Sequence, residues 1–473
     1  MLYNHAVKLA TTSYGFLFTL LLVTCVTYSG AFRGDFQFDD YSTILDNPHY
    51  AGWETFAEHA GHIVRPLLSL TFLVDRTLYG SSPVGYHILN LLLHLGSGIL
   101  VYLILTRAVA DKNRQLPLCT ALVFLIHPIQ TETVTYISGR ASGLMAFFYL
   151  LAIFLYNKAS ESQHVGTLRR IYLLGAVAAG VLSIGSKETA VTLPMALLLW
   201  DVLIRKLRGP SLCKAIFSSH LPFWILLVFA AGWAWSHPRY AYLAHFSLQL
   251  RLPWENVLSE AHALVYAILL FLWPWKQSFD HDLPDFLSLV QWPLPVDLFV
   301  IAVLIAVAVV MVGRLPLLSF GIGWYFLQLL PTMVIPRADL LSERNFYLAS
   351  IGLFLALVVC ASTVLTRFSK TFRDSIPVRS VARNMALMMV LGLCVMTFQR
   401  NTLYQDQVSL WSDTVAKSPH KARPHNNLGH AYALQGEWDR AIDEFRLAVQ
   451  LDHHYTLAQN NLRNAYLHQV GRQ

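Results

Sequence analysis

Long apolar runs recur along this chain almost to residue 400, and they restrict its fold more than any other feature. A helix needs roughly 17 to 25 mostly apolar residues to cross about 30 Å of hydrocarbon, and water-soluble cores do not repeat such runs from end to end. Hydrophobic residues make up 55% of the chain and charged residues only 13%, about half the charge of an ordinary globular protein. We therefore predict an all-α, polytopic membrane protein.

Twelve segments are candidate membrane spans. They are residues 10–31, 85–106, 116–135, 141–157, 171–186, 189–204, 220–236, 257–273, 296–313, 316–335, 346–366 and 384–399. The first is longer than a signal-peptide core and lacks a clear cleavage site, so we interpret it as an uncleaved anchor. The five cysteines have neither metal-ligand spacing nor the pattern of a disulfide framework.

Lysine and arginine cluster in alternate loops, which predicts the orientation of the chain. The clusters are 107–114, 158–170, 205–214 and 367–383. Cytoplasmic loops are enriched in these residues, so we expect the clusters inside, and the net charge of +7 does not require a nucleic-acid partner. Residues 32–84 and the turns near 127–140, 187 and 337–344 are then expected outside.

One segment creates a conflict of parity. Twelve crossings would return the C-terminus to the cytoplasm, whereas a single span after the basic loop 367–383 sends it outside. The segment 257–273 is short, follows Glu255 and Glu260, and ends in Trp-Pro-Trp. We favour the interpretation that it re-enters the membrane or lies at its surface without crossing.

After residue 400 the sequence becomes polar and repeats with a period typical of tetratricopeptide repeats. The matching positions are Leu428, Gly429, Tyr432, Ala441, Phe445 and Ala448. Trp411 stands 34 residues before Phe445, and Leu462 with Tyr466 repeats Leu428 with Tyr432. We therefore divide the chain into a membrane domain, 1–399, and a short repeat tail, 400–473, that leans on the membrane domain or on a partner because fewer than three full repeats are present.

The first outer loop, 32–84, carries two adjacent carboxylates, Asp39 and Asp40, just beyond the first span. A partly desolvated Asp beside a like charge has a raised proton affinity, which suits it to accept a proton from a hydroxyl. Together with His127 the pair could also bind a divalent cation. Asp-rich loops are also ordinary solvated turns, and from the pair alone that interpretation is the more frequent one.

A second group, His127, Glu132 and Arg140, is expected at the outer mouth of the third and fourth spans. Ionisable groups at membrane depth are costly and are usually paired or functional. His127 or Glu132 could orient a substrate or bind a cation, and Arg140 could face a phosphate. A cluster that only holds the hairpin together is an equally good interpretation.

Two further outward turns, Lys187-Glu188 and Glu343-Arg344, each place a cation beside a carboxylate. Alone, each could be a local ion pair of little energy. Together with Arg65 and Arg140, they would supply a base for an acceptor and cations for a leaving phosphate, as transfer from a phosphate-linked lipid requires. The chain has no phosphate-cradling glycine loop, nucleophile elbow or metalloprotease helix.

As an ordered set, these motifs resemble the transmembrane O-mannosyltransferases that target cadherins and their bacterial relatives. The set comprises Gly-Asp-Phe-x-Phe-Asp-Asp at 34–40, Arg-Pro-Leu at 65–67, Gly-Tyr-His-x-x-Asn-x-x-x-His at 85–94, His-Pro-x-x-x-Glu-x-Val at 127–134, Gly-Arg at 139–140, Lys-Glu at 187–188, Glu-Arg at 343–344 and the repeat tail. The resemblance covers nearly the whole chain, although the cadherin-directed proteins carry longer repeat arrays. It implies a GT-C fold with its active site at the outer face, a polyprenyl-phosphate sugar donor, and a first-loop acid as base. That role transfers to Asp39 or Asp40, and we favour Asp39.

We predict a membrane glycosyltransferase that moves a sugar from a polyprenyl phosphate to a Ser or Thr hydroxyl of an envelope or secreted protein by direct inverting displacement. An envelope glycan is the alternative acceptor, and a protein bound by the tail is a further predicted partner. The expected location is a bacterial inner membrane with the site and the tail periplasmic, or lumenal in a eukaryotic endoplasmic reticulum. A lipid-linked sugar flippase and an assembly scaffold are the competing hypotheses, although a transporter would favour paired repeats that this sequence lacks.

Overall fold

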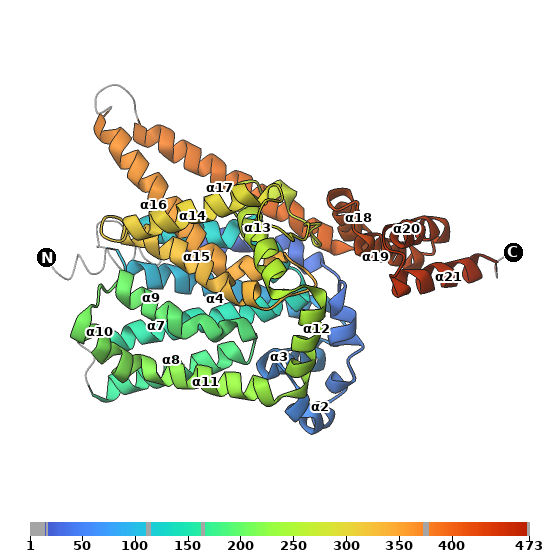
Figure 1. Ribbon diagram of the computed structural model, residues 1–473, viewed down its shortest axis with the longest axis horizontal. Coiled ribbons are helices and arrows are strands. Elements are labelled where there is room, and N and C mark those ends of the chain that lie inside the picture. Colours follow the sequence, from blue (N-terminus) through green and yellow to red (C-terminus); the bar gives the residue numbers. More distant parts are fainter. Residues whose placement is uncertain (1–14, 16–17, 110–114, 162–165, 372–377, 471–473) are drawn as a thin grey trace.

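The computed structural model describes residues 15, 18–109, 115–161, 166–371 and 378–470, and every regular element in these ranges is a helix. The predicted all-α class is therefore confirmed. Long helices run side by side and form a bundle, and a group of shorter helices, α18 to α21, lies beyond one end of it (Figure 1). We call that end the outer end and the opposite end, which carries the basic loops, the inner end.

Eight helical segments are long and apolar enough to cross a membrane within the described ranges, which makes this a multi-pass membrane protein. They include α4 (Pro83–Thr106), α7 (Arg140–Ser160), α8 (Thr167–Ile184), α10 (Gly209–Ala215) continued by α11 (Leu221–Ser236), α13 (Pro253–Leu272), α15 (Pro316–Val334), α16 (Tyr347–Thr371) and α17 (Val378–Thr402). Many of them begin at proline, which is tolerated in the first turn because its missing N–H would have no helical partner there.

Four expected spans are shorter than the sequence suggests. The apolar helices 18–33, α5 (Gln115–Ile126), α9 (Leu193–Leu203) and α14 (Leu294–Val310) have fewer than 18 residues. The expected helix 116–135 ends at Ile126 because Pro128 follows, and the chain continues as short turns to residue 139. The start of the expected first span, 10–31, lies outside the described residues apart from residue 15.

Helix α13 has both ends at the outer end of the bundle. Near its start, Asn256 Nδ2 donates to the Met333 carbonyl, 2.8 Å away at the end of α15. Near its finish, the Phe271 carbonyl accepts from His127 Nε2 at 3.0 Å, just beyond α5. A crossing helix would bring its two ends to opposite faces, so these contacts agree with the prediction that this segment does not cross. The alternation of the remaining helices then leaves the C-terminal helices at the outer end.

The last four helices, α18 (Gln407–Lys417), α19 (Ala422–Leu434), α20 (Trp438–Leu451) and α21 (Thr456–Val470), follow one another as short antiparallel hairpins. A Cβ on Gly429 would stand 2.8 Å from the ring of Phe445, so only glycine lets α19 and α20 approach this closely. Ala441 and Phe445 are buried between these helices. The spacing of small and aromatic residues in the tail thus corresponds to a real helix-to-helix contact.

Candidate functional site

A polar cavity of about 270 Å³ opens at the outer end of the bundle. Five separate stretches of chain build it: the first loop, α3 (Pro66–Tyr79) with the residue before it, the start of α7, the turn before α9, and the segment between α15 and α16. Its lining residues are Asp39, Thr43, Arg65, Leu68, Phe72, Ser138, Ala141, Lys187, Arg337, Ala338, Asp339, Ser342, Arg344 and Asn345. We call this the outer cavity.

The two adjacent aspartates occupy different environments. Asp40 is fully buried, and its two carboxylate oxygens accept hydrogen bonds from the backbone N–H groups of Gln37 at 2.9 Å and Ser138 at 2.8 Å and from the Ser138 hydroxyl. Burial raises the pKa of Asp40 to about 7. Asp39 is partly exposed and lines the outer cavity. Asp40 therefore ties the first loop to the start of α7, and Asp39 is the carboxylate that a ligand in the cavity can reach.

Burial raises the pKa of Asp39, while the cations of Arg344 and Arg423 act in the opposite direction. A carboxylate with a raised proton affinity that still faces a cavity is suited to general-base chemistry. The backbone N–H of Asp39 donates to the Tyr136 hydroxyl at 3.2 Å, which holds this part of the loop in place.

The residue before Asp39 is held in an uncommon conformation. Phe38 has φ of 45°, in the left-handed region that residues other than glycine rarely occupy. Its ring packs edge-on against Trp411 of α18, with centroids 5.5 Å apart, and against Phe279 at 6.1 Å. The guanidinium of Arg423 from α19 lies 5.9 Å above the same ring. Side chains from the tail thus help to set the direction in which Asp39 points.

Arg65 and Glu188 form a two-pronged ion pair beside the outer cavity. Arg65 Nε donates to Glu188 Oε2 at 3.0 Å and Nη2 donates to Oε1 at 2.8 Å. Although burial alone would raise it, the pKa of Glu188 lies below its usual range because of this arginine. The pairing fixes the guanidinium against the cavity wall, which is the geometry that suits recognition of an anion.

Lys187 is a buried cation without an anionic partner. Its Nζ donates to Ser142 Oγ and Asn345 Oδ1, both at 2.8 Å, and no carboxylate within the described ranges forms an ion pair with it. Burial lowers the pKa of Lys187 well below its usual range, and Arg337 and Arg65 lower it further. An uncompensated buried cation is costly, so an anion that entered the cavity would relieve this cost.

Arg344 is positioned from behind by Glu132. The two carboxylate oxygens of Glu132 accept from the backbone N–H of Arg344 at 3.0 Å, from its Nη1 at 2.9 Å, and from Ser342 Oγ at 2.9 Å. Glu132 is 1% exposed and does not line the outer cavity. It therefore acts on the cavity through the orientation of Arg344.

Three of the expected site residues lie away from the cavity. Arg140 is fully buried, pairs with Asp75 at 2.5 Å, and donates to Asn90 Oδ1 at 2.7 Å. Glu343 is buried between His281 and Arg400. His127 uses Nδ1 to accept from the Ile129 N–H and Nε2 to donate to the Phe271 carbonyl. These side chains hold the elements around the cavity together.

The residues suggested for a divalent cation do not fit one. Both oxygens of Asp40 and both ring nitrogens of His127 are already engaged, and neither residue shares the cavity with Asp39. In the part of the chain that the structure describes, no group of three His, Cys, Asp or Glu side chains is arranged to hold a metal ion.

The sequence did not single out three polar residues that line the cavity, namely Arg337, Asp339 and Asn345. All lie in the turn 337–345, which the charge pattern had already placed outside. Asp339 pairs with Arg423 of α19. A polar residue in a turn whose neighbours are site candidates is the only signal that could have pointed to them.

With this geometry established, the comparison with known proteins becomes specific. The chain is 26% identical over 499 aligned residues to the human protein named Protein O-mannosyl-transferase TMTC1, covering 93% of this chain and 55% of that protein. It is 25% identical to Protein O-mannosyl-transferase F38B6.6 of Caenorhabditis elegans, covering 93% of this chain and 63% of that protein. This chain is similar to proteins named O-mannosyltransferases. The resemblance seen in the ordered motifs is thereby confirmed.

A third relative, Protein O-mannosyl-transferase Tmtc3 of Drosophila melanogaster, is 25% identical, covering 92% of this chain and 55% of its own length. The chain thus spans little more than half the length of the relatives it matches. No protein-family model matches it. The similarity extends over both the bundle and most of the remaining chain, so the outer cavity lies within the compared region.

Proposed function

We propose that this chain is a membrane glycosyltransferase that moves a sugar, mannose by analogy with its relatives, from a polyprenyl phosphate to a Ser or Thr hydroxyl of a protein. One observation carries the proposal: Asp39 shares a single outer cavity with Arg65, Lys187 and Arg344. One carboxylate that can accept a proton and several fixed cations that can hold a phosphate are the two requirements of this reaction.

In the proposed reaction, Asp39 accepts the proton of the acceptor hydroxyl. The hydroxyl oxygen forms a bond to the anomeric carbon of the sugar while the bond from that carbon to the phosphate oxygen breaks. The polyprenyl phosphate leaves with the electron pair, and the developing charge lies against Lys187, Arg65 and Arg344. The direct displacement inverts the anomeric centre, and no covalent intermediate with the protein is required.

The orientation that suits this reaction puts the outer cavity and the tail, 400–473, on the periplasmic or lumenal side. The basic loops support it, because they lie at the opposite end of the bundle from the cavity. The donor then reaches the cavity from the surrounding bilayer, and the protein acceptor from the aqueous side. Asp280, which pairs with Lys421 and Arg423, links the tail to the rim of the cavity.

The test is transfer of radiolabelled mannose from polyprenyl-phosphate mannose by the full-length protein in membranes. Peptides and proteins rich in Ser and Thr are the acceptors, and envelope glycans form a parallel arm. Asp39→Asn should reduce the rate by about 10²- to 10⁴-fold, the contribution of a general base. Asp35→Asn is the matched control, because Asp35 lies in the same loop, is exposed and does not line the cavity.

Transfer in the wild type that disappears in Asp39→Asn and persists in Asp35→Asn supports the proposal. Full activity in Asp39→Asn would refute the mechanism. Movement of the lipid-linked sugar across proteoliposomes without any sugar transfer would replace the proposal by the flippase hypothesis.

A further inference from the structure

A second polar cavity, of about 350 Å³, lies at the inner end of the bundle, far from the residues discussed so far. It is lined by Ala159, Ser160, Glu161, Arg169, Arg205, Leu207, Ser211, Lys214, Ala215, Ser218 and Ser219. These residues come from the end of α7, the start of α8, the segment after α9, and the helix 209–236. We call this the inner cavity.

Three cations from three different segments line the inner cavity. Arg169 Nη2 donates to Ser219 Oγ at 2.9 Å, and Arg205 Nη1 donates to Asp201 Oδ1 at 2.8 Å, so both guanidinium groups are fixed in direction. Lys214 is exposed. The carboxylate in the lining, Glu161, pairs with Arg107 at 3.0 Å and with Lys158 at 3.6 Å. The cavity therefore presents an excess of positive charge and several hydroxyl groups.

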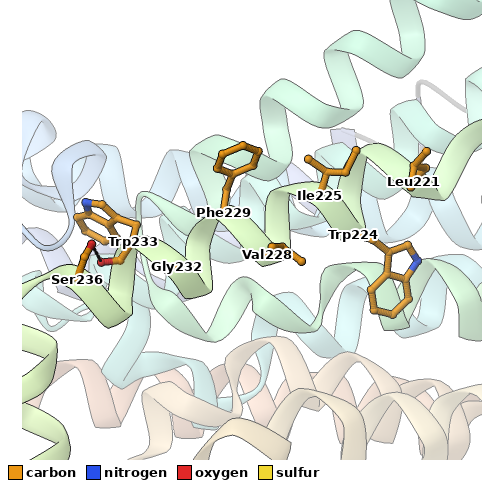
Figure 2. A pocket seen from close by; sticks show the side chains of 8 residues that line it. All are labelled: Leu221, Trp224, Ile225, Val228, Phe229, Gly232, Trp233 and Ser236. Carbon is orange, nitrogen blue, oxygen red and sulfur yellow. Dashed lines mark hydrogen bonds between the residues drawn. The ribbon is translucent and has the colours of Figure 1, made fainter.

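An apolar groove of about 510 Å³ continues from this cavity along the same helix. Its eight lining residues, Leu221, Trp224, Ile225, Val228, Phe229, Gly232, Trp233 and Ser236, all belong to α11 (Figure 2). Val228 and Phe229 are 72% and 73% exposed, which is favourable only against lipid. Helix α11 runs along one edge of the bundle (Figure 1).

The cavity and the groove meet at one point on the chain. Ser218 and Ser219 line the inner cavity, and the groove begins two residues later at Leu221. From Leu221 to Phe229 the helix rises about 12 Å, which is within the depth of one leaflet, half of about 30 Å of hydrocarbon. A charged site for a head group thus leads directly onto an apolar track for one chain.

We propose that the inner end binds an anionic glycerophospholipid of the cytoplasmic leaflet, with its phosphate in the inner cavity and one acyl chain in the groove of α11. Basic pockets between transmembrane helices on the cytoplasmic side are the sites that hold such head groups. The site is separate from sugar transfer and depends only on the orientation of the bundle.

The experiment is a titration of the purified full-length protein in phosphatidylcholine nanodiscs or mixed micelles with phosphatidylglycerol, followed by thermal unfolding. A ligand that binds only the folded state raises the unfolding temperature in proportion to its affinity. Each cation near the surface strengthens binding roughly fivefold. Arg169→Gln with Lys214→Gln should therefore weaken binding about 25-fold.

The matched control is Lys206→Gln with Arg314→Gln, which removes two exposed charges from the same end of the bundle but outside the inner cavity. Binding should change by less than about twofold. An equal loss in both double variants would overturn the proposal, since it would mean that the inner end attracts anionic lipid without a defined site. Lys214→Gln alone, at an exposed position, keeps the test valid if the double variant does not fold.

Two further arms identify the ligand. Glycerol 3-phosphate should produce no shift of the unfolding temperature, because it lacks the chain that fills the groove. A saturating shift with this soluble phosphate would overturn the lipid assignment in favour of a free anion. Phosphatidylglycerol with brominated chains should quench tryptophan fluorescence, and Trp224→Phe should reduce this quenching. Unchanged quenching in Trp224→Phe would remove the chain from the groove.

Discussion

The two ends of the bundle use the same residue types in opposite ways. At the outer end, cations are buried and oriented by carboxylates from other elements, as in Arg65 with Glu188 and Arg344 with Glu132. At the inner end, many cations, including Lys206 and Arg314, are exposed. Exposed positive charge determines which way the chain inserts, whereas buried and oriented charge creates a site for a ligand. Counting charges alone cannot separate the two roles.

The inner end also contains a buried polar network, but it closes on itself. The Tyr156 hydroxyl donates to Asp201 Oδ2 at 2.6 Å, and His220 Nε2 lies 3.0 Å from the same oxygen. None of these three residues lines the inner cavity. Lys187 at the outer end differs, because its amine lies against a cavity and has only neutral partners. A closed network stabilises the fold, whereas an open one is available to a substrate.

The largest effect is expected from Lys187→Met. Loss of a fixed cation that faces the leaving phosphate should lower kcat by about 10²- to 10³-fold, while the free energy of unfolding stays the same or rises because a costly buried charge is removed. Transfer assays and thermal unfolding measure the two quantities. Lys276→Met, an exposed lysine outside the cavity, is the control. A loss of stability equal to the loss of activity would show that Lys187 has a structural role only.

Arg344→Gln should lower activity roughly 10- to 100-fold, the range for a hydrogen bond that involves a charge. It should also move the acid limb of the profile of kcat/KM against pH. Burial raises the pKa of Asp39 and the cation of Arg344 opposes this, so its removal raises that pKa further. The base then becomes deprotonated only at higher pH, and the limb shifts upward. Arg344→Lys keeps the charge and should leave the limb in place; an unshifted limb in both variants would separate Asp39 from the profile.

A smaller effect is expected at the inner end from Asp201→Asn. The change weakens hydrogen bonds from Tyr156 and Arg205 inside a buried network and should cost about 1 to 3 kcal/mol of stability. The activity of each folded molecule should not change. Unfolding curves and turnover normalised to folded protein test this. A selective loss of turnover would contradict the division between a catalytic outer end and a structural inner end.

The smallest effect is expected from Arg107→Gln. Arg107 pairs with Glu161 at 3.0 Å near the inner surface, where both side chains are about a quarter exposed. Pairs of this kind contribute less than about 1 kcal/mol, and turnover should remain at the wild-type value. Measured losses larger than those of Asp201→Asn would reverse the ranking of the two positions.

Much of the fold follows from local sequence, whereas the roles of individual site residues do not. Apolar runs predict the helices, and the basic loops predict which ends lie together. The burial of Asp40 depends on Ser138, and that of Arg140 depends on Asp75. Such partners lie far apart in the chain, so no motif shows that one aspartate of the pair is enclosed and the other is open. Pro128 is a local signal, but the length of the run 116–135 obscured it.

The conformation of Phe38 has a consequence for where this protein can be cut. Composition divides the chain near residue 400, yet the left-handed Phe38 is packed against Trp411 of α18 and covered by Arg423 of α19. A fragment that stops before these helices would release Phe38 toward the extended region and turn the Asp39 carboxylate away from the cavity. We therefore expect the smallest fragment with an intact base to extend through Leu434, so that the first repeat helices are part of the catalytic unit.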